Sequence, residues 1–129
     1  MDSSHLLVTI SEGKLTKSPQ GMLVEGMAAN FVVNIGIVGA VFAKEIVSKF
    51  IVIVPIIGIF VGLGLEHVIA NFCLFALTFF GSDPLPAALT VGNVALNWTL
   101  VWIGNFIGGG LLIGGVYAWL NNGPEDYRD

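Results

Sequence analysis

Charged residues are scarce in this sequence of 129 residues. Only five Lys and Arg and nine Asp and Glu are present, 11% of the chain, whereas an average soluble domain carries about 25%. So few charges cannot form the polar shell of a compact soluble enzyme. Five basic residues also cannot line a groove that tracks a nucleic-acid backbone. These absences exclude both classes of protein.

Cysteine is nearly absent as well, since Cys73 is the one copy and an internal disulfide is therefore excluded. Apolar residues, by contrast, make up 55% of the chain, and the mean hydropathy is +0.87. Intrinsic disorder requires low hydrophobicity and is excluded too. The composition indicates a protein of the lipid bilayer, in which each helical crossing needs about 20 apolar residues.

The apolar residues form three long runs. They cover residues 21–43, 50–80 and 93–120. Pro84 and Pro86 prevent a helix from continuing between the second and third runs. We therefore predict an all-α integral membrane protein with three transmembrane helices.

The middle run is too long for one straight crossing. A continuous helix over 50–80 would be about 46 Å long against a hydrocarbon core of about 30 Å. Pro55 and the glycines after it predict two half-helices joined by an irregular stretch at 60–64. A long tilted helix is the alternative. Interrupted helices are typical of transporter sites, because their ends present free backbone groups to a substrate.

Lysine placement suggests an orientation in the membrane. Lys44 and Lys49 favour a cytoplasmic loop between the first two runs, and Arg128 lies on the same side. Lys14 and Lys17 count against this orientation. The expected order is an extracellular or periplasmic loop over 1–20, the membrane domain over 21–120 and a cytoplasmic tail over 121–129.

Function is sought among the few polar residues inside the membrane. His67 and Asn71 lie one helical turn apart on one face of the middle run. His67 is either a neutral histidine bonded to a neighbouring helix, or a proton donor or polar waypoint beside a substrate route. The glycines just before it favour the second interpretation. We expect Glu66 to bond groups freed by the helix break. No metal site is expected, because Glu66 and His67 do not face each other on a helix and no second histidine is near.

Two motifs make the sequence recognisable. Residues 64–72 read GLEHVIANF and residues 97–109 read NWTLVWIGNFIGG. They resemble signatures of the formate/nitrite transporter family in order and in approximate spacing. Asn30 also lies in the preceding run where that family has an asparagine.

This resemblance implies a fold and a function. Members of the family are homopentamers, and each protomer holds its own pore for small monovalent anions such as formate, nitrite, hydrosulfide or lactate. A protomer has six helices in two inverted, aquaporin-like halves, with the second and fifth helices broken. The chain resembles the second half, and its middle run resembles the fifth helix.

The resemblance also implies roles for individual residues. His67 matches the central pore histidine, and Phe60 matches an aromatic residue of the cytoplasmic-side constriction. Asn30 matches an asparagine near the histidine, and Val33 falls at an apolar pore-lining position. Lys14 matches a basic residue that draws anions into the outer vestibule.

Structural or hydrogen-bonding support is expected from Glu66, Asn71, Asn97 and Asn105. A bare anion bears a large desolvation cost in an apolar slot. A histidine, with an unperturbed pKa of about 6.5, can lend a proton so that the neutral acid crosses.

The resemblance covers only half of the family's pore, and the threonine-bearing loop that faces the histidine is missing. We expect a fragment or truncated member; pairing with another half-chain, or with itself, is the alternative. The predicted function is small-anion transport at the plasma membrane by a multi-pass protein, without cofactor, nucleic acid or enzymatic activity. A non-transporting helical scaffold or accessory subunit, packing through glycines such as Gly104 and Gly108, is the alternative function.

Overall fold

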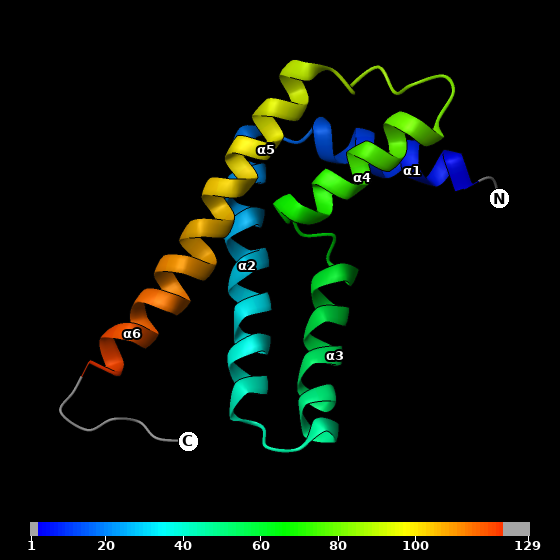
Figure 1. Cartoon of the computed structure of the whole chain (residues 1–129). Coiled ribbons are helices and arrows are strands. Elements are labelled where there is room, and N and C mark those ends of the chain that lie inside the picture. Colours follow the sequence, from blue (N-terminus) through cyan, green and yellow to red (C-terminus); the bar gives the residue numbers. More distant parts are fainter. Residues whose placement is uncertain (1–2, 123–129) are drawn as a thin grey trace.

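The computed structural model describes residues 3–122, and its regular elements are helices. In chain order these are α1 (Ser3–Leu15), α2 (Pro19–Phe42), α3 (Ile46–Gly62), α4 (Val68–Gly81), α5 (Val91–Asn105), the π-helix η1 (Phe106–Gly115) and α6 (Val116–Leu120). The last three follow one another without a break and form a single long rod (Figure 1).

The helices form two groups along the long axis of the molecule. Helices α2 and α3 pack side by side and run antiparallel, while the rod of α5, η1 and α6 crosses α2 obliquely (Figure 1). Helices α1 and α4 pack together at the end where α5 begins. The connection between α2 and α3 lies at the opposite end. The link between α3 and α4 therefore lies near the middle of the molecule.

Local sequence signals begin two of the helices. The Ser18 hydroxyl accepts the backbone N–H of Gly21 at 3.1 Å, and Pro19 occupies the first position of α2. Proline is well suited there because a backbone N–H in the first turn of a helix has no acceptor within the helix, so its absence costs no hydrogen bond. Thr90 caps α5 in the same way by accepting the N–H of Asn93 at 3.2 Å.

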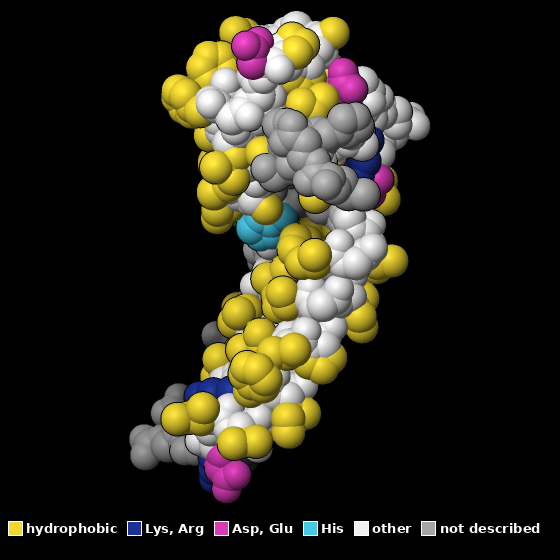
Figure 2. Space-filling model, turned by 90° about the vertical axis from the view of Figure 1, so that its right-hand side faces the viewer, with side chains coloured by type: hydrophobic (Ala, Val, Ile, Leu, Met, Phe, Trp, Pro, Cys, Tyr) yellow, Lys and Arg dark blue, Asp and Glu magenta, His cyan; other side chains and the backbone are white. Residues whose placement is uncertain are grey.

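Two helical stretches, Pro19–Phe42 and Val91–Leu120, are long and apolar enough to cross a bilayer, whereas α3 and α4 are shorter apolar helices. Figure 2 shows a face covered largely by hydrophobic side chains, with most of the charged groups toward the two ends. That α3 and α4 together make the middle one of three crossings stays a prediction.

The sequence predicts a loop over residues 1–20, but Ser3–Leu15 form helix α1. This helix is held by tertiary contacts with α4. The hydroxyls of Ser11 and Thr78, both buried, lie 2.6 Å apart, and Leu15 is buried as well. The side of the membrane on which α1 lies stays a prediction. Of the predicted tail over 121–129, residues 123–129 lie outside the described part of the chain.

Helix α2 meets the rod through glycine. A Cβ added at Gly104 would collide with the carbonyl oxygen of Leu23, and one added at Gly108 would collide with that of Met27. The helix backbones therefore touch directly, as is common where small residues mediate packing in membranes. This close approach brings the first half of α2 against the end of α5 and the start of η1, beside the link between α3 and α4.

Candidate functional site

The site is built around the non-helical link Leu63–His67 between α3 and α4. Gly64 has a φ of +63°, a left-handed conformation that glycine adopts without steric cost. This link begins later than the irregular stretch predicted at 60–64, since Phe60 is still helical, and that α3 and α4 are the two halves of one broken transmembrane helix stays a prediction. Pro55 lies inside α3 and does not end it, because a proline removes only one hydrogen bond and the helix continues on both sides.

Within this link, the Glu66 side chain is fully buried. Its Oε1 lies 3.0 Å from the Nζ of Lys14 and 2.8 Å from the Nζ of Lys17. Its Oε2 accepts the Nδ2 of Asn71 at 2.6 Å. A buried carboxylate is very costly unless it is paired and hydrogen-bonded. Both oxygens of Glu66 meet this condition and are occupied, which leaves them engaged in holding the link.

Asn105, at the end of α5, binds the link from the other side. Its Oδ1 accepts the backbone N–H of Val68 at 2.9 Å, and its Nδ2 donates to the carbonyls of Gly26 at 2.8 Å and Glu66 at 3.0 Å. One buried side chain therefore joins α2, the link and the first turn of α4. The supporting role predicted for Asn105 in the pore stays a prediction.

Asn71 and Asn97 extend the same network. Asn71 Nδ2 donates to Asn97 Oδ1 at 2.9 Å, and Asn97 Nδ2 donates to the carbonyl of Lys14 at 3.4 Å. Both asparagines are fully buried. They connect α4 and α5 to the end of α1.

His67 stands at the start of α4 and is half-buried. Its ring packs edge-on against Phe60, with centroids 5.8 Å apart and planes at 76°. It also lines a cavity of about 550 Å³ that Asn30 and Asn105 share. The structure thus brings three sequence-predicted residues, His67, Phe60 and Asn30, to one place.

The Asn30 amide reaches the rod because η1 carries glycine opposite it. Its Nδ2 donates to the Asn105 carbonyl at 2.9 Å, and the Nδ2 of Asn34 donates to the Asn30 carbonyl at 2.7 Å. A Cβ added at Gly109 would lie 2.7 Å from Asn30 Nδ2 and 2.5 Å from Asn34 Nδ2. Val33 lies half-buried on α2 and is not among the described residues that line this cavity.

Lys14 lies in the last turn of α1. Its Nζ donates to Glu66 and, at 3.3 Å, to the carbonyl of Leu65, so its charge is paired within the protein. Its predicted role in drawing anions toward the pore stays a prediction.

Lys14, Lys17, Glu25 and Glu66 form a charged cluster. The sequence analysis did not identify Lys17 or Glu25 as part of the site. Lys17 also pairs with Glu25 of α2 and so connects Glu25 to Glu66. Burial lowers the pKa of Lys17, but hydrogen bonds to Glu25 and Glu66 outweigh this effect and raise the pKa above its ordinary value. No spacing in the sequence links these residues, because Lys17 lies between helices and Glu66 lies 49 positions further on.

The sequence analysis also missed two aromatic residues that line the cavity beside His67. These are Trp102 and Phe106. Their rings stack, with centroids 6.0 Å apart. Trp102 lies four residues before Phe106, and this helical spacing is the sequence signal that could have indicated their contact.

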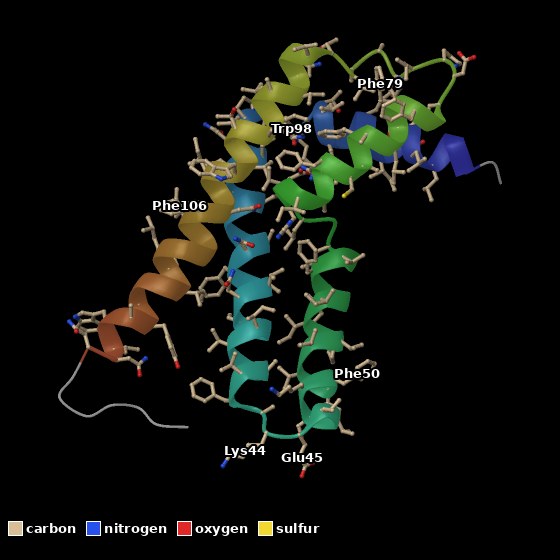
Figure 3. All side chains as sticks on the ribbon, viewed as in Figure 1. Lys44, Glu45, Phe50, Phe79, Trp98 and Phe106 are labelled. Atoms are coloured by element: carbon tan, nitrogen blue, oxygen red, sulfur yellow. The ribbon has the colours of Figure 1, made fainter. Side chains whose placement is uncertain are left out.

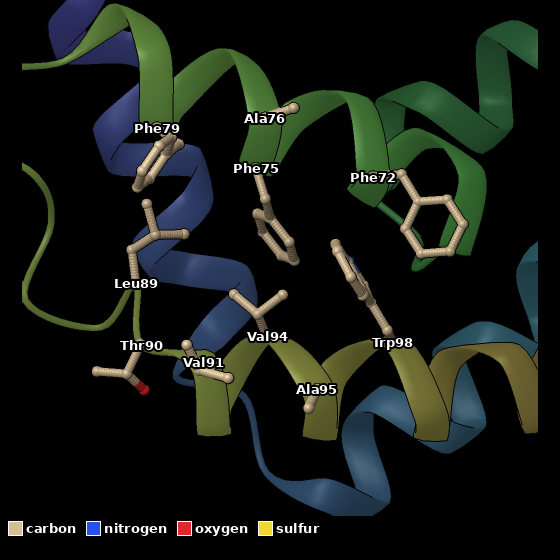
Figure 4. A pocket seen from close by; sticks show the side chains of 10 residues that line it. All are labelled: Phe72, Phe75, Ala76, Phe79, Leu89, Thr90, Val91, Val94, Ala95 and Trp98. Atoms are coloured by element: carbon tan, nitrogen blue, oxygen red, sulfur yellow. The ribbon is translucent and has the colours of Figure 1, made fainter.

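A second cavity, of about 450 Å³, lies between α4 and α5. Figure 4 shows its aromatic lining, which includes Phe72, Phe75, Phe79 and Trp98. Its Thr90 hydroxyl already caps α5. This cavity offers an anion little polar contact, so the cavity beside His67 is the better candidate for a substrate pathway.

Comparison with known proteins decides the family. The profile described as formate/nitrite transporter matches residues 1–119. The chain belongs to the formate/nitrite transporter family. This family comprises transporters and channels rather than enzymes, and its membership implies a membrane location.

Individual relatives agree with this membership. The chain is 36% identical over 117 residues to a formate channel from Bacillus thuringiensis. It is 31% identical over 111 residues to a nitrite transporter from Escherichia coli. A solved structure described as an FNT family ion channel superimposes with a TM-score of 0.81 at 27% identity.

The chain matches only part of each relative. The alignments cover 90%, 86% and 89% of this chain, but 43% of the formate channel, 40% of the nitrite transporter and 45% of the solved channel. The chain therefore spans less than half the length of the relatives it matches.

Proposed function

We propose that this chain forms the second half of a pore for small monovalent anions of the formate, nitrite, lactate or hydrosulfide type. The observation that carries the proposal is the position of His67. A titratable ring at a helix break, packed on Phe60 and facing a cavity with the Asn30 amide, is suited to pass a proton to an anion.

In this pore, His67 acts as the proton donor. A weak-acid anion that reaches the apolar constriction beside Phe60 takes a proton from the imidazolium, directly or through water, and crosses as the neutral acid. The neutral form avoids most of the desolvation cost of the charge. Asn30 lies along the cavity, where its amide group can hydrogen-bond the acid.

The proposed pore has a second wall outside this chain. Much of the apolar surface of α3 and α4 is exposed and His67 is only half-buried, and an exposed apolar surface of this kind requires a partner or lipid. We infer that a matching N-terminal half covers the His67 face, that α3 and α4 then act as one broken transmembrane helix, and that five such units form a multi-pass pentamer in the plasma membrane.

The proposal is tested by formate and nitrite uptake into proteoliposomes. The chain is reconstituted alone and together with the N-terminal half of the Bacillus thuringiensis formate channel. We expect the wild-type chain to take up formate or nitrite in at least one of these preparations. In His67→Phe this uptake should be lost or strongly reduced, while size-exclusion chromatography still shows the pentamer. Cys73→Ser, an exposed change on the same helix, is the matched control.

Two results would contradict the proposal. Absence of uptake in both preparations, with the protein folded, would favour a non-transporting membrane scaffold. Uptake that is equal in wild type and His67→Phe from pH 5 to 8 would remove the histidine from the mechanism.

A further inference from the structure

A second lysine shares the buried carboxylate next to the pore histidine. Lys17, in the link between α1 and α2, lies 2.8 Å from Glu66 Oε1 and also pairs with Glu25 of α2. Glu66 directly precedes His67 in the chain. The cluster of Lys14, Lys17, Glu25 and Glu66 is therefore built on the residue that directly precedes the proposed proton donor.

The formal charges of this cluster cancel, and Glu25 is needed for the balance. Lys14 already neutralises Glu66 at 3.0 Å, so Lys17 would add one uncompensated positive charge if Glu25 were absent. Lys17 is about one quarter exposed and Glu25 about one third. Their pair thus borders solvent, while Glu66 is sealed inside.

We propose that Glu25 limits the rate of anion entry by cancelling the charge of Lys17, which pairs with Glu66 directly before His67 in the chain. This inference rests on the proposed transport function and assigns a rate-setting role to a carboxylate outside the pathway. A surplus positive charge at a pore mouth raises the local concentration of anions. Such an effect weakens as added salt screens it over a Debye length of about 10 Å at 0.1 M.

Four chains separate this role from simple support of the fold. They are wild type, Glu25→Gln, Lys17→Met and the double variant Lys17→Met/Glu25→Gln. Their clusters carry formal charges of zero, plus one, minus one and zero. Initial rates of formate uptake are measured in the preparation that transports formate, at about 10 mM and about 300 mM ionic strength.

We expect Glu25→Gln to raise the rate about two- to fivefold at low ionic strength, and Lys17→Met to lower it by a similar factor. High salt should reduce both differences. The double variant should return to the wild-type rate, because its charge is again zero. A purely structural pair would behave differently, since loss of both partners would not restore the rate.

Glu45→Gln is the matched control. It removes the same charge from an exposed residue at the far end of α3, close to Lys44 (Figure 3). When formate is supplied on the side of Lys17, it should enter through Glu45→Gln at the wild-type rate. If Lys17→Met fails to fold, Lys17→Gln takes its place.

The outcomes distinguish this inference from the proposed function. Wild-type transport with no increase in Glu25→Gln, or with an increase that salt does not reduce, overturns the role of Glu25 alone. A double variant slower than both single variants also overturns it. Absence of transport by the folded wild-type chain in every preparation overturns both the function and the inference.

Discussion

The side-chain oxygen of Asn105 accepts the backbone N–H of Val68 at 2.9 Å, so α5 caps the beginning of α4. The first N–H groups of a helix have no partner within the helix, and His67, at the N-cap position, makes no side-chain cap in this structure. Asn105 provides the missing acceptor from a distant part of the chain. The His67 ring is consequently left to face Phe60 and the cavity.

Loss of this cap should destabilise the protein. Asn105→Leu removes the side-chain partner of the Val68 N–H and of the Glu66 carbonyl, and a second bond to the Gly26 carbonyl within α2. Each unsatisfied buried group costs about 1–3 kcal/mol, so we expect a clearly lower melting temperature in detergent. Asn121→Ala, which removes only an exposed bond to the Tyr117 carbonyl, should change the stability by less than about 0.5 kcal/mol. Equal melting temperatures for the two variants would count against the capping role.

Glycine packing predicts a contrast between two substitutions of the same type. In Gly108→Ala the new methyl group would collide with the Met27 carbonyl, so α2 and the rod must separate. In Gly58→Ala it would meet open space inside α3, and alanine should stabilise that helix by about 0.8–1 kcal/mol. Thermal unfolding should therefore move in opposite directions for the two variants. A Gly108→Ala protein as stable as wild type would contradict the close helix contact.

The crossing of the membrane by α3 and α4 together can be tested with single cysteines. In a Cys73→Ala background, Asp83→Cys and Glu45→Cys place thiols at exposed positions just after the end of α4 and just before the start of α3. On intact cells a membrane-impermeant maleimide should label Asp83→Cys, and Glu45→Cys only after the cells are opened. Labelling of both from outside would overturn the middle crossing, and the reverse pattern would invert the predicted orientation.

The pH dependence of the proposed transport should come from the titration of His67. We expect wild-type uptake to change between pH 5 and 8, since histidine is the side chain that ordinarily titrates in this range. Lys17 does not contribute, because its raised pKa keeps it charged throughout. In His67→Phe the remaining uptake should vary much less with pH, and an unchanged profile would assign the titration to another group. Uptake at constant formate gradient and varied pH measures the difference.

Much of the helical layout was predictable from the composition, the apolar runs, and the prolines and glycines that interrupt these runs. The runs expected at 21–43 and 93–120 correspond to helical stretches at Pro19–Phe42 and Val91–Leu120. The boundaries moved by about two residues because Ser18 and Thr90 cap the helices slightly earlier than the apolar residues begin. Helix α1 was missed, since its apolar pattern is weak and its contacts with α4 come from tertiary packing.

The candidate site was predictable only in part. Motif resemblance pointed to His67, Phe60 and Asn30. His67 and Asn30 line the same cavity, and the ring of Phe60 packs against that of His67. The pairing of Lys17 with Glu25 and Glu66 carried no sequence signal. Ion pairs between distant segments depend on where the helices are packed, and periodicity along one segment contains no information about this.

The sequence by itself determined that the protein is apolar and helical, and that an interruption lies in the glycine-containing part of its second apolar run. Those properties follow from local chemistry: scarce charge, apolar runs, capping hydroxyls and a glycine able to adopt positive φ. Only the tertiary structure decided what holds the interruption in place. Glu66 is buried there because two lysines and Asn71 reach it from α1, the α1–α2 link and α4, and Asn105 reaches the same link from α5. A buried charge is tolerable only when such partners converge on it in space.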